Sequence, residues 1–464
     1  MRRTIVILSL IALLFVIVGC SLNQQECESE NNSNDFQYIT VADGIEITKY
    51  IGNSIYVHIP PKIENSRVTS IGVAAFSGCA GITSITIPDS VIRIERSVFI
   101  DCEELTNIEI PYTIPIIDNH AFYDYHGQIT LSLPAGETSI SSDILAHYDD
   151  LLRDTWIAPD TRVTLTIPES VTNIDASAFI SCSWLTNIFI PSSITSIGNF
   201  AFKSSRLTEI CVDNSNPIFS SMDGVLYNKD KTTLLAFPPS YKQQSEFKIP
   251  ESVTTIGVGA FANCYKLRDI VIPESVMMID RAAFAGCSNL RGVVIPKNQN
   301  LIEARTFDGC SALTSVIIPD KVMSIGESAF SGCRALTSII ISNSVTRIGE
   351  RAFQSCSGLT EIVLSNNLTS IGKNALANCK NLSSIAIPDS VTHIGMEIVR
   401  DNMGNTIELS PFTGISDLMV TYKGGTYNAK QVNAWVTTKN GIKTSEDPIY
   451  DLPREFHDLF QVFD

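Results

Sequence analysis

The chain has 464 residues, 44% of them hydrophobic, and a formal net charge of −16 at pH 7. The negative charge repels a phosphate backbone, so nucleic acid is not an expected partner. The hydrophobic content is sufficient for a sizeable core, either in two or three ordinary domains or in one long repeat array.

The first residues, 1–19, have the features of a lipoprotein signal peptide. Two arginines precede an apolar run over residues 5–18, which is short for a membrane span and typical of a signal segment. The run ends in Ile-Val-Gly-Cys, which resembles the bacterial lipobox and implies cleavage before Cys20 and lipidation of that cysteine. The alternative is an ordinary signal peptide with a chance cysteine. We expect a lipid-anchored mature chain outside the cytoplasm, with residues 20–35 as a flexible tether.

A 23-residue period governs most of the remaining chain. It is visible as a recurring phenylalanine, and in the C-terminal half cysteine keeps the same interval. A ladder of this length predicts a repeat array whose units stack on one another. The residues in this register include Phe76, Phe99, Phe122, Phe179, Phe202, Phe261, Phe284, Phe307, Phe330 and Phe353, with Cys264, Cys287, Cys310, Cys333, Cys356 and Cys379.

One unit, ALTSVIIPDKVMSIGESAFSGCR over residues 312–334, shows how each repeat is built. Leu313, Val316 and Ile318 lie on one face of a short strand, which ends at Pro319 because proline lacks an N–H donor. The Ala-Phe pair further on indicates the apolar side of a helical or 3₁₀ turn. A single unit cannot bury this apolar side, whereas stacked units share a continuous core.

The recurring motif I-P-x-S-V-x-x-I-G-x-x-A-F-x-x-C, seen in VMSIGESAFSGC and VTRIGERAFQSC, closely resembles the BspA-like (treponemal-type) bacterial leucine-rich repeats over residues 36–405. The resemblance implies an α/β leucine-rich repeat solenoid, right-handed and β-rich overall, with a parallel sheet on its concave side and short helical turns. Register positions indicate about thirteen rungs. The resemblance also implies a cell-surface lipoprotein that binds host or bacterial surface proteins in adhesion.

The period is interrupted near residues 146–158 and near residues 213–245. We expect the first insertion to bulge from its rung and the second to contain two apolar strands around a polar turn. Residues 406–464 lie beyond the repeats and are expected to cap the last rung. Within this segment the sequence predicts a hairpin over Gly424-Gly425 and then a helix ending near Gly441.

Residues suited to catalysis or metal binding are sparse. Twelve cysteines in an exported chain often indicate disulfides, but their shared repeat position favours buried free thiols. His120 and His126 lie near Asp118 and Asp124, an arrangement more typical of solvated loop groups than of a metal site. No nucleophile, phosphate-loop or metalloprotease motif is present. We therefore expect neither an enzyme, nor a cofactor, nor a bound metal.

The position between the two isoleucines of L-x-x-I-x-I should face away from the core, because successive strand residues point to opposite sides. Early rungs place polar residues there, whereas five later rungs place Val or Ile there. One interpretation of this regional change is a contact strip for a protein partner, a second copy of the chain or the C-terminal segment folding back. The alternative is that β-branched residues merely suit strands, in a structural spacer or a self-associating envelope protein. The candidate protein-binding residues are Phe189, Val271, Val294, Ile317, Ile340 and Val363.

Overall fold

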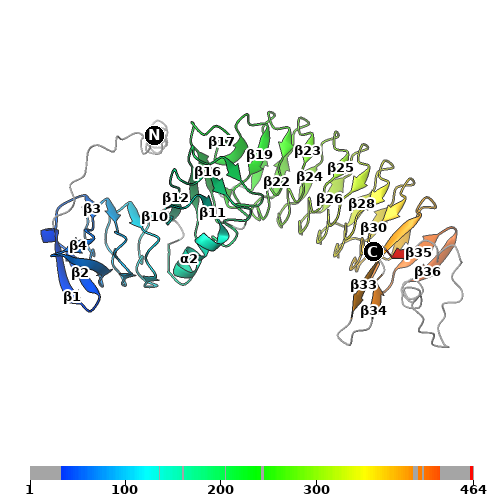
Figure 1. The fold of residues 1–464 in the computed structure, drawn as a ribbon. Coiled ribbons are helices and arrows are strands. Elements are labelled where there is room, and N and C mark those ends of the chain that lie inside the picture. The colour runs from blue at the N-terminus through cyan, green and yellow to red at the C-terminus, as the bar shows by residue number, and fades with distance from the viewer. Residues whose placement is uncertain are drawn as a thin grey trace, which may run out of the picture. The chain divides into compact units, whose positions relative to one another are not determined.

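The computed structural model describes residues 33–134, 136–158, 161–203, 205–241, 245–400, 406–409, 412–428 and 460–462. Cys20 and the helix expected to end near Gly441 lie outside these residues. The chain divides into two compact units. Unit 1 is Met1–Gly127 with Trp156–Ala158, and unit 2 is Gln128–Thr155 with Pro159–Asp464. Both units are built from stacked turns of chain that carry parallel strands (Figure 1).

Each turn of the stack contributes two strands. A major strand carries the L-x-x-I-x-I pattern, and a minor strand, usually of two residues, follows the proline turn. The described chain has fifteen major strands, so the solenoid has about fifteen turns, more than the sequence indicated. The additional turns escape the 23-residue register because Val57 pairs with Ile85, and Ile385 with Val420, across longer intervals.

Unit 1 begins with a short 3₁₀ turn and an antiparallel strand pair that precede its regular turns. These are η1 (Ser33–Asp35), β1 (Phe36–Val41) and β2 (Gly44–Tyr50), and β4 (Lys62–Ile63) pairs antiparallel with β5 (Ser66–Ile71). Its major strands are β3 (Tyr56–His58), β6 (Ser84–Thr86) and β8 (Asn107–Ile110). Its minor strands are β5 (Ser66–Ile71), β7 (Arg93–Ile94) and β9 (Ile116–Ile117).

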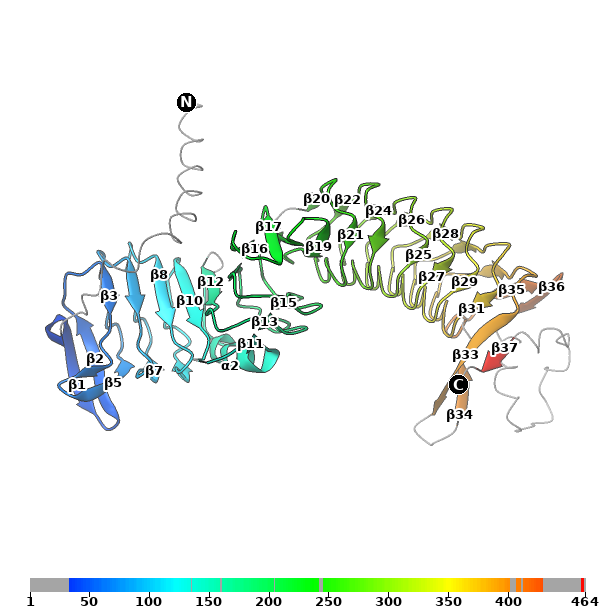
Figure 2. The same cartoon turned by 45° about the horizontal axis from the view of Figure 1, so that its top comes forward.

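Unit 2 contains the longer run of turns. Its major strands are β10 (Gln128–Ser132), β12 (Arg162–Thr166), β14 (Asn187–Ile190), β16 (Glu209–Val212), β20 (Glu246–Lys248), β22 (Asp269–Val271), β24 (Gly292–Val294), β26 (Ser315–Ile317), β28 (Ser338–Ile340), β30 (Glu361–Val363), β32 (Ser384–Ala386) and β35 (Met419–Tyr422). Its minor strands are β11 (Ser139–Ile140), β13 (Asn173–Ile174), β15 (Ser196–Ile197), β19 (Thr233–Ala236), β21 (Thr255–Ile256), β23 (Met278–Ile279), β25 (Leu301–Ile302), β27 (Ser324–Ile325), β29 (Arg347–Ile348), β31 (Ser370–Ile371) and β33 (His393–Arg400). Figure 2 shows the major strands β20, β22, β24, β26 and β28 along one side of this unit, with the minor strands β25, β27, β29 and β31 along another.

The corner that precedes each phenylalanine is a tight turn instead of the helical turn expected from the sequence. In most turns the residue two places before the phenylalanine has a left-handed backbone, with φ of 59° at Arg305 and 54° at Ser328. Such a residue cannot continue a helix, and it directs its N–H along the stack. Phe307 N accordingly donates to Ala329 O in the next turn at 2.8 Å. The corner is therefore a third ladder of hydrogen bonds between turns.

The core of unit 2 is a column of stacked phenylalanine rings. Phe284, Phe307 and Phe330 are almost fully buried, with ring centroids 5.5 and 5.4 Å apart. This run of the column begins at Phe237, whose ring lies 4.9 Å from that of Phe261, and a separate run stacks Phe179 on Phe202 at 5.4 Å. All ten described cysteines are free thiols. Seven of them are buried, as their repeat position predicts: Cys182, Cys264, Cys287, Cys310, Cys333, Cys356 and Cys379.

The two insertions fold differently. Helix α2 (Ser142–Leu152) lies in the first and is capped by Ser141, whose Oγ accepts from Ile144 N. Tyr148 and Leu152 pack it inward, and the Tyr148 hydroxyl donates to Ser132 O at 2.6 Å. The second insertion forms β17 (Phe219–Met222) and β18 (Val225–Asn228), and β18 pairs antiparallel with β19. This pairing confirms the predicted strands around a polar turn.

The expected C-terminal hairpin forms one residue earlier than predicted. Strands β35 and β36 (Gly425–Asn428) pair with Tyr422 opposite Gly425, so Lys423 and Gly424 make the turn. Both have positive φ, of 47° and 79°, as a two-residue type I′ hairpin requires. Strand β35 also pairs in parallel with β32. The remaining strands are β34 (Thr406–Leu409), antiparallel to β33, and β37 (Phe460–Val462), parallel to β33.

Candidate functional site

Five apolar side chains in unit 2 project from consecutive major strands into solvent. We call this set the apolar stripe: Val271, Val294, Ile317, Ile340 and Val363. Their exposed fractions are 56%, 69%, 75%, 70% and 45%, in chain order. The outward orientation predicted from strand alternation is confirmed, whereas the role of the stripe in binding stays a prediction.

Strand geometry explains why these residues are exposed. In β28 the side chain of Ile339 is 2% exposed, and Ile341 just beyond it is equally buried, because both point into the core. Ile340 lies between them and must point the other way. Of the three consecutive isoleucines, two therefore fill the core and the third is exposed to solvent.

The stripe is continuous across adjacent turns. Val294 pairs with Ile317 between β24 and β26, and Ile340 pairs with Val363 between β28 and β30. Strands β26 and β28 lie next to each other but belong to different hydrogen-bonded sheets. The minor strands β25, β27 and β29 form one unbroken parallel ladder through the same turns, so the rungs that carry the stripe keep their spacing.

Small residues accompany the stripe, a feature that the sequence reading missed. Two positions before each stripe residue, β24, β26 and β28 have Gly292, Ser315 and Ser338. A Cβ added at Gly292 would meet no atom within 4 Å, so the space beside Val294 is open. The apolar side chains therefore stand above their neighbours as a ridge. The signal was available in the sequence, because the same position holds Asp269 and Glu361 in the flanking turns.

Phe189, the sixth predicted residue, is not part of the stripe. It is 40% exposed on β14, where it pairs with Cys211 on β16. Its sheet ends at β16, and the stripe begins in the separate sheet that starts at β20. The inserted strands β17 and β18 lie between them in the chain and interrupt the repeat.

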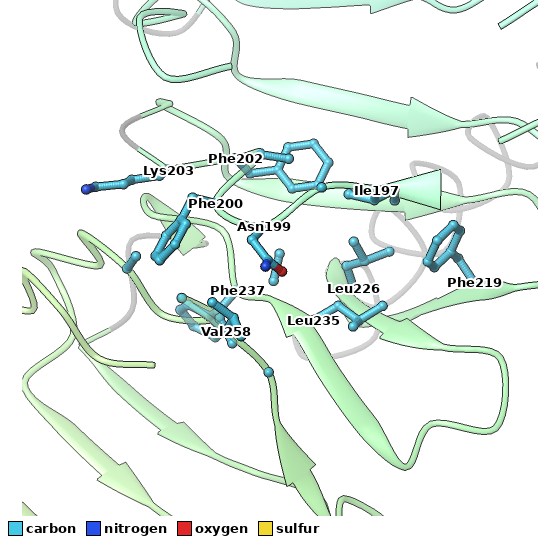
Figure 3. Close-up of a pocket in the computed structure, with 17 residues that line it drawn as sticks. Ile197, Asn199, Phe200, Phe202, Lys203, Phe219, Leu226, Leu235, Phe237 and Val258 are labelled. Carbon is cyan, nitrogen blue, oxygen red and sulfur yellow. The ribbon is translucent and has the colours of Figure 1, made fainter. Parts of the chain in front are cut away.

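A cavity of about 80 Å³ lies where the phenylalanine column is interrupted, between Phe202 and Phe237. Figure 3 shows Phe202 on one side, Phe237 and Val258 on the other, and Asn199 between them. Asn199 and Lys203 provide the only polar side chains of its lining. The Lys203 ammonium lies over the ring of Phe200, 5.7 Å from its centroid.

Within the described ranges, no three His, Cys, Asp or Glu side chains come together to hold a metal ion. His120 Nδ1 lies 3.9 Å from Asp118 Oδ1, and His126 Nε2 lies 3.6 Å from Asp124 Oδ1, and both imidazoles are exposed. None of the described helices is long and apolar enough to cross a membrane.

Stacked turns of about 23 residues, parallel strands and a buried aromatic column define a leucine-rich repeat solenoid. The sequence profile of the BspA type leucine rich repeat region matches residues 50–155, 161–291 and 278–404 in six copies. The chain belongs to this family.

Several solved bacterial structures resemble the chain. A leucine rich cell surface protein from Faecalibacterium prausnitzii is 28% identical, with 73% of this chain and 95% of that chain covered and a TM-score of 0.44. A leucine-rich repeat protein from Eubacterium ventriosum is 23% identical, with coverages of 85% and 97% and a TM-score of 0.49. The pneumococcal vaccine antigen PcpA is 21% identical, with coverages of 83% and 99% and a TM-score of 0.42. No curated protein matches the chain.

Proposed function

We propose that this protein is displayed on the bacterial cell surface, where it binds a protein partner through the apolar stripe. The observation that carries the proposal is the exposure of five β-branched apolar side chains, one on each of five consecutive major strands. Their exposed fractions range from 45% to 75%. Soluble proteins seldom leave a contiguous apolar surface open unless it serves in an interaction.

The composition around the stripe favours binding over strand propensity alone. Strand propensity accounts for Val or Ile at the outward position, but it does not account for the small residues beside them. With Gly292, Ser315 and Ser338 as neighbours, the three central turns carry no formal charge at either outward position of the strand. An apolar centre with charges at its edge, here Asp269 and Glu361, is the usual composition of a protein-binding surface.

The partner that fits this surface is a protein with an apolar groove. The ridge formed by Val294, Ile317 and Ile340 would insert into the groove, and the polar residues at either end would face the groove's rim. The negative charge of the chain adds a general preference for a partner that is not itself strongly acidic.

Anchoring through Cys20 supports the surface location. The arginines and the apolar run before Cys20 direct export, and a lipid on that cysteine would hold the mature chain at a membrane. Replacing Cys20 with alanine should abolish incorporation of labelled palmitate and block lipoprotein-type cleavage. Palmitate that remains on the variant would contradict the anchor.

The test of binding compares the wild type with the double variant Ile317→Thr, Ile340→Thr, which keeps β-branching while adding a hydroxyl. Both are used as bait for host matrix proteins and for neighbouring bacterial cells, and self-association is followed by light scattering. We expect the variant to fold normally and to lose capture of its partner. Unchanged capture and unchanged self-association would favour a structural spacer.

A matched control is available in the same turns. Met277 and Met323 are 59% and 56% exposed and apolar, but they lie beside the minor strands, away from the stripe. The double variant Met277→Thr, Met323→Thr removes similar apolar surface. We expect it to capture the partner as the wild type does, which would separate an effect of the stripe from a general loss of hydrophobicity.

A further inference from the structure

Two aromatic side chains in unit 1 form an exposed pair outside the repeat core. The rings of Tyr123 and Trp156 have centroids 5.3 Å apart and planes inclined by 39°. Their exposed fractions are 47% and 45%. Trp156 comes from the end of the first insertion. Its main-chain N–H donates to the main-chain carbonyl oxygen of Asn119 in unit 1 at 2.8 Å. The insertion thus brings a tryptophan to a turn that the repeat alone would leave without one.

Both side chains have their polar ends available. Neither the Trp156 indole N–H nor the Tyr123 hydroxyl hydrogen-bonds to a residue that the structure describes. By contrast, the buried Trp184 donates its indole N–H to Asp149 Oδ1 at 2.7 Å. A rigid aromatic surface with an unused donor at its edge is suited to recognition, because covering it releases water from apolar area and also forms hydrogen bonds.

The turn beside the pair presents both hydrogen-bond donors and acceptors. His120 has its ring 6.5 Å from that of Tyr123, and its Nδ1 lies 2.6 Å from Asn119 Oδ1. Because the Asn119 amide oxygen faces His120, the Asn119 side-chain N–H₂ group points away from that imidazole. The Asp118 carboxylate accepts from His120 N at 2.9 Å and keeps further acceptor capacity. Aromatic faces, an amide, an imidazole and a carboxylate therefore lie within one small area.

We propose that this cluster is a carbohydrate-binding site that takes a neutral glycan. A pyranose ring has an apolar C–H face, which would lie on the indole or phenol ring, and hydroxyls that each donate and accept hydrogen bonds. Asp118 and Asn119 would accept from these hydroxyls, and the Asn119 amide, His120 and the free ends of Tyr123 and Trp156 would donate to them. The site is distinct from the apolar stripe, which lies in unit 2.

A cationic ligand fits the same residues less well. Both carboxylates on this turn already have an imidazole within 4.0 Å, Asp118 with His120 and Asp124 with His126. A lysine or arginine from a partner would compete with these contacts and would be repelled when an imidazole is protonated. It would also leave the donors of the cluster unpaired. A ligand rich in hydroxyls uses donors and acceptors together.

The test is saturation-transfer NMR on the full chain, purified in a zwitterionic detergent that contains no sugar. The probes are lactose, cellobiose, maltose, chitobiose and mannobiose, with a hexalysine peptide as the cationic comparison. We expect saturable transfer to at least one disaccharide, loss of its signal in Trp156→Ala and a weaker signal in Tyr123→Ala. The control is Tyr56→Ala, a tyrosine of unit 1 that is 51% exposed but outside the pair, and it should keep the signal.

Circular dichroism of Trp156→Ala and Tyr123→Ala shows whether each variant retains the β spectrum of the wild type. A loss of binding can then be told apart from misfolding. Transfer to no disaccharide, or transfer that survives in folded Trp156→Ala and Tyr123→Ala, would overturn the proposal. Hexalysine binding that depends on Trp156 in place of disaccharide binding would also overturn it, because the site would then recognise a cation.

Discussion

The thiol of Cys333 donates a hydrogen bond to the carbonyl oxygen of Phe307 in the preceding turn, with Sγ and O 3.3 Å apart. The same oxygen accepts from Cys310 N at 3.1 Å, so the thiol occupies its second acceptor position. The contact recurs through the stack of unit 2 at 3.1 to 3.6 Å, for example from Cys310 to Phe284 and from Cys356 to Phe330. Cysteine at this position is therefore a small buried residue that also links one turn to the next.

We predict that the thiols of the stack are reduced and protected in the native protein. Cys287, Cys310, Cys333 and Cys356 are fully buried and share one orientation along the column, each donating to the turn before it. Alkylation should be slow in buffer and complete in denaturant, with all four found as free cysteines by mass spectrometry. Peptides joined by disulfides between turns would contradict this arrangement.

The stability of the protein should fall at alkaline pH because burial raises the pKa values of Cys310 and Cys333, and the neighbouring Cys379 together with burial raises that of Cys356. Burial raises the pKa of Cys333 above its ordinary value of 9.0, so the folded state keeps a proton that the unfolded state loses. The stabilisation is present below pH 9 and is lost as the pH rises above 9. The rate of this loss approaches about 1.4 kcal/mol per pH unit for each thiol with a raised pKa. Urea unfolding at pH 8 and pH 10 should show that the free energy of unfolding falls less between these pH values in Cys333→Ala than in the wild type. Equal losses would mean that the buried thiols do not cause the pH dependence.

Phe307→Ala should destabilise the middle of unit 2 by about 3–5 kcal/mol, because it opens a cavity in a close-packed stack. The rings of Phe284 and Phe330 lose their shared neighbour, and each turn depends mainly on the turns beside it. Amide exchange followed by mass spectrometry should show the faster exchange centred on these turns. Uniform acceleration over the whole unit would indicate a single cooperative fold instead of a chain of coupled turns.

Two glycines offer a matched test of how closely the turns approach. A Cβ at Gly349 would lie 2.7 Å from both Glu327 N and Gly326 C, whereas a Cβ at Gly292 would meet nothing within 4 Å. Gly349→Ala should therefore cost about 1–3 kcal/mol by overpacking. Gly292→Ala should be neutral or stabilising by up to about 1 kcal/mol, since alanine loses less entropy on folding. Thermal unfolding of both variants measures the two effects. Equal melting temperatures would contradict the close approach of the turns at Gly349.

The sequence predicted the features that depend on side-chain alternation and repeat length. Ile340 could be assigned to the solvent side because Ile339 and Ile341 had to fill the core. The phenylalanine column followed from a fixed interval, and so did the buried cysteines.

Features set by backbone conformation or by contacts outside the register could not be predicted. Ser328 gives no sign in its side chain that its φ is positive, and the turn it forms replaced the expected helical one. Phe237 enters the aromatic column 35 residues after Phe202, where no 23-residue interval could find it. Trp156 approaches Tyr123 only because helix α2 and the residues after it return the chain to that turn.

The measurement that tests the binding role of the stripe most directly is photo-crosslinking on living cells. Benzoylphenylalanine is placed at position 317 in the stripe and, in a second strain, at position 323, where Met323 is 56% exposed away from the stripe. Both strains are mixed with host matrix proteins or neighbouring bacteria and irradiated. Binding through the stripe should give a discrete adduct of one partner protein from position 317 and none from position 323. No adduct at position 317, or the same adduct from both positions, would contradict it.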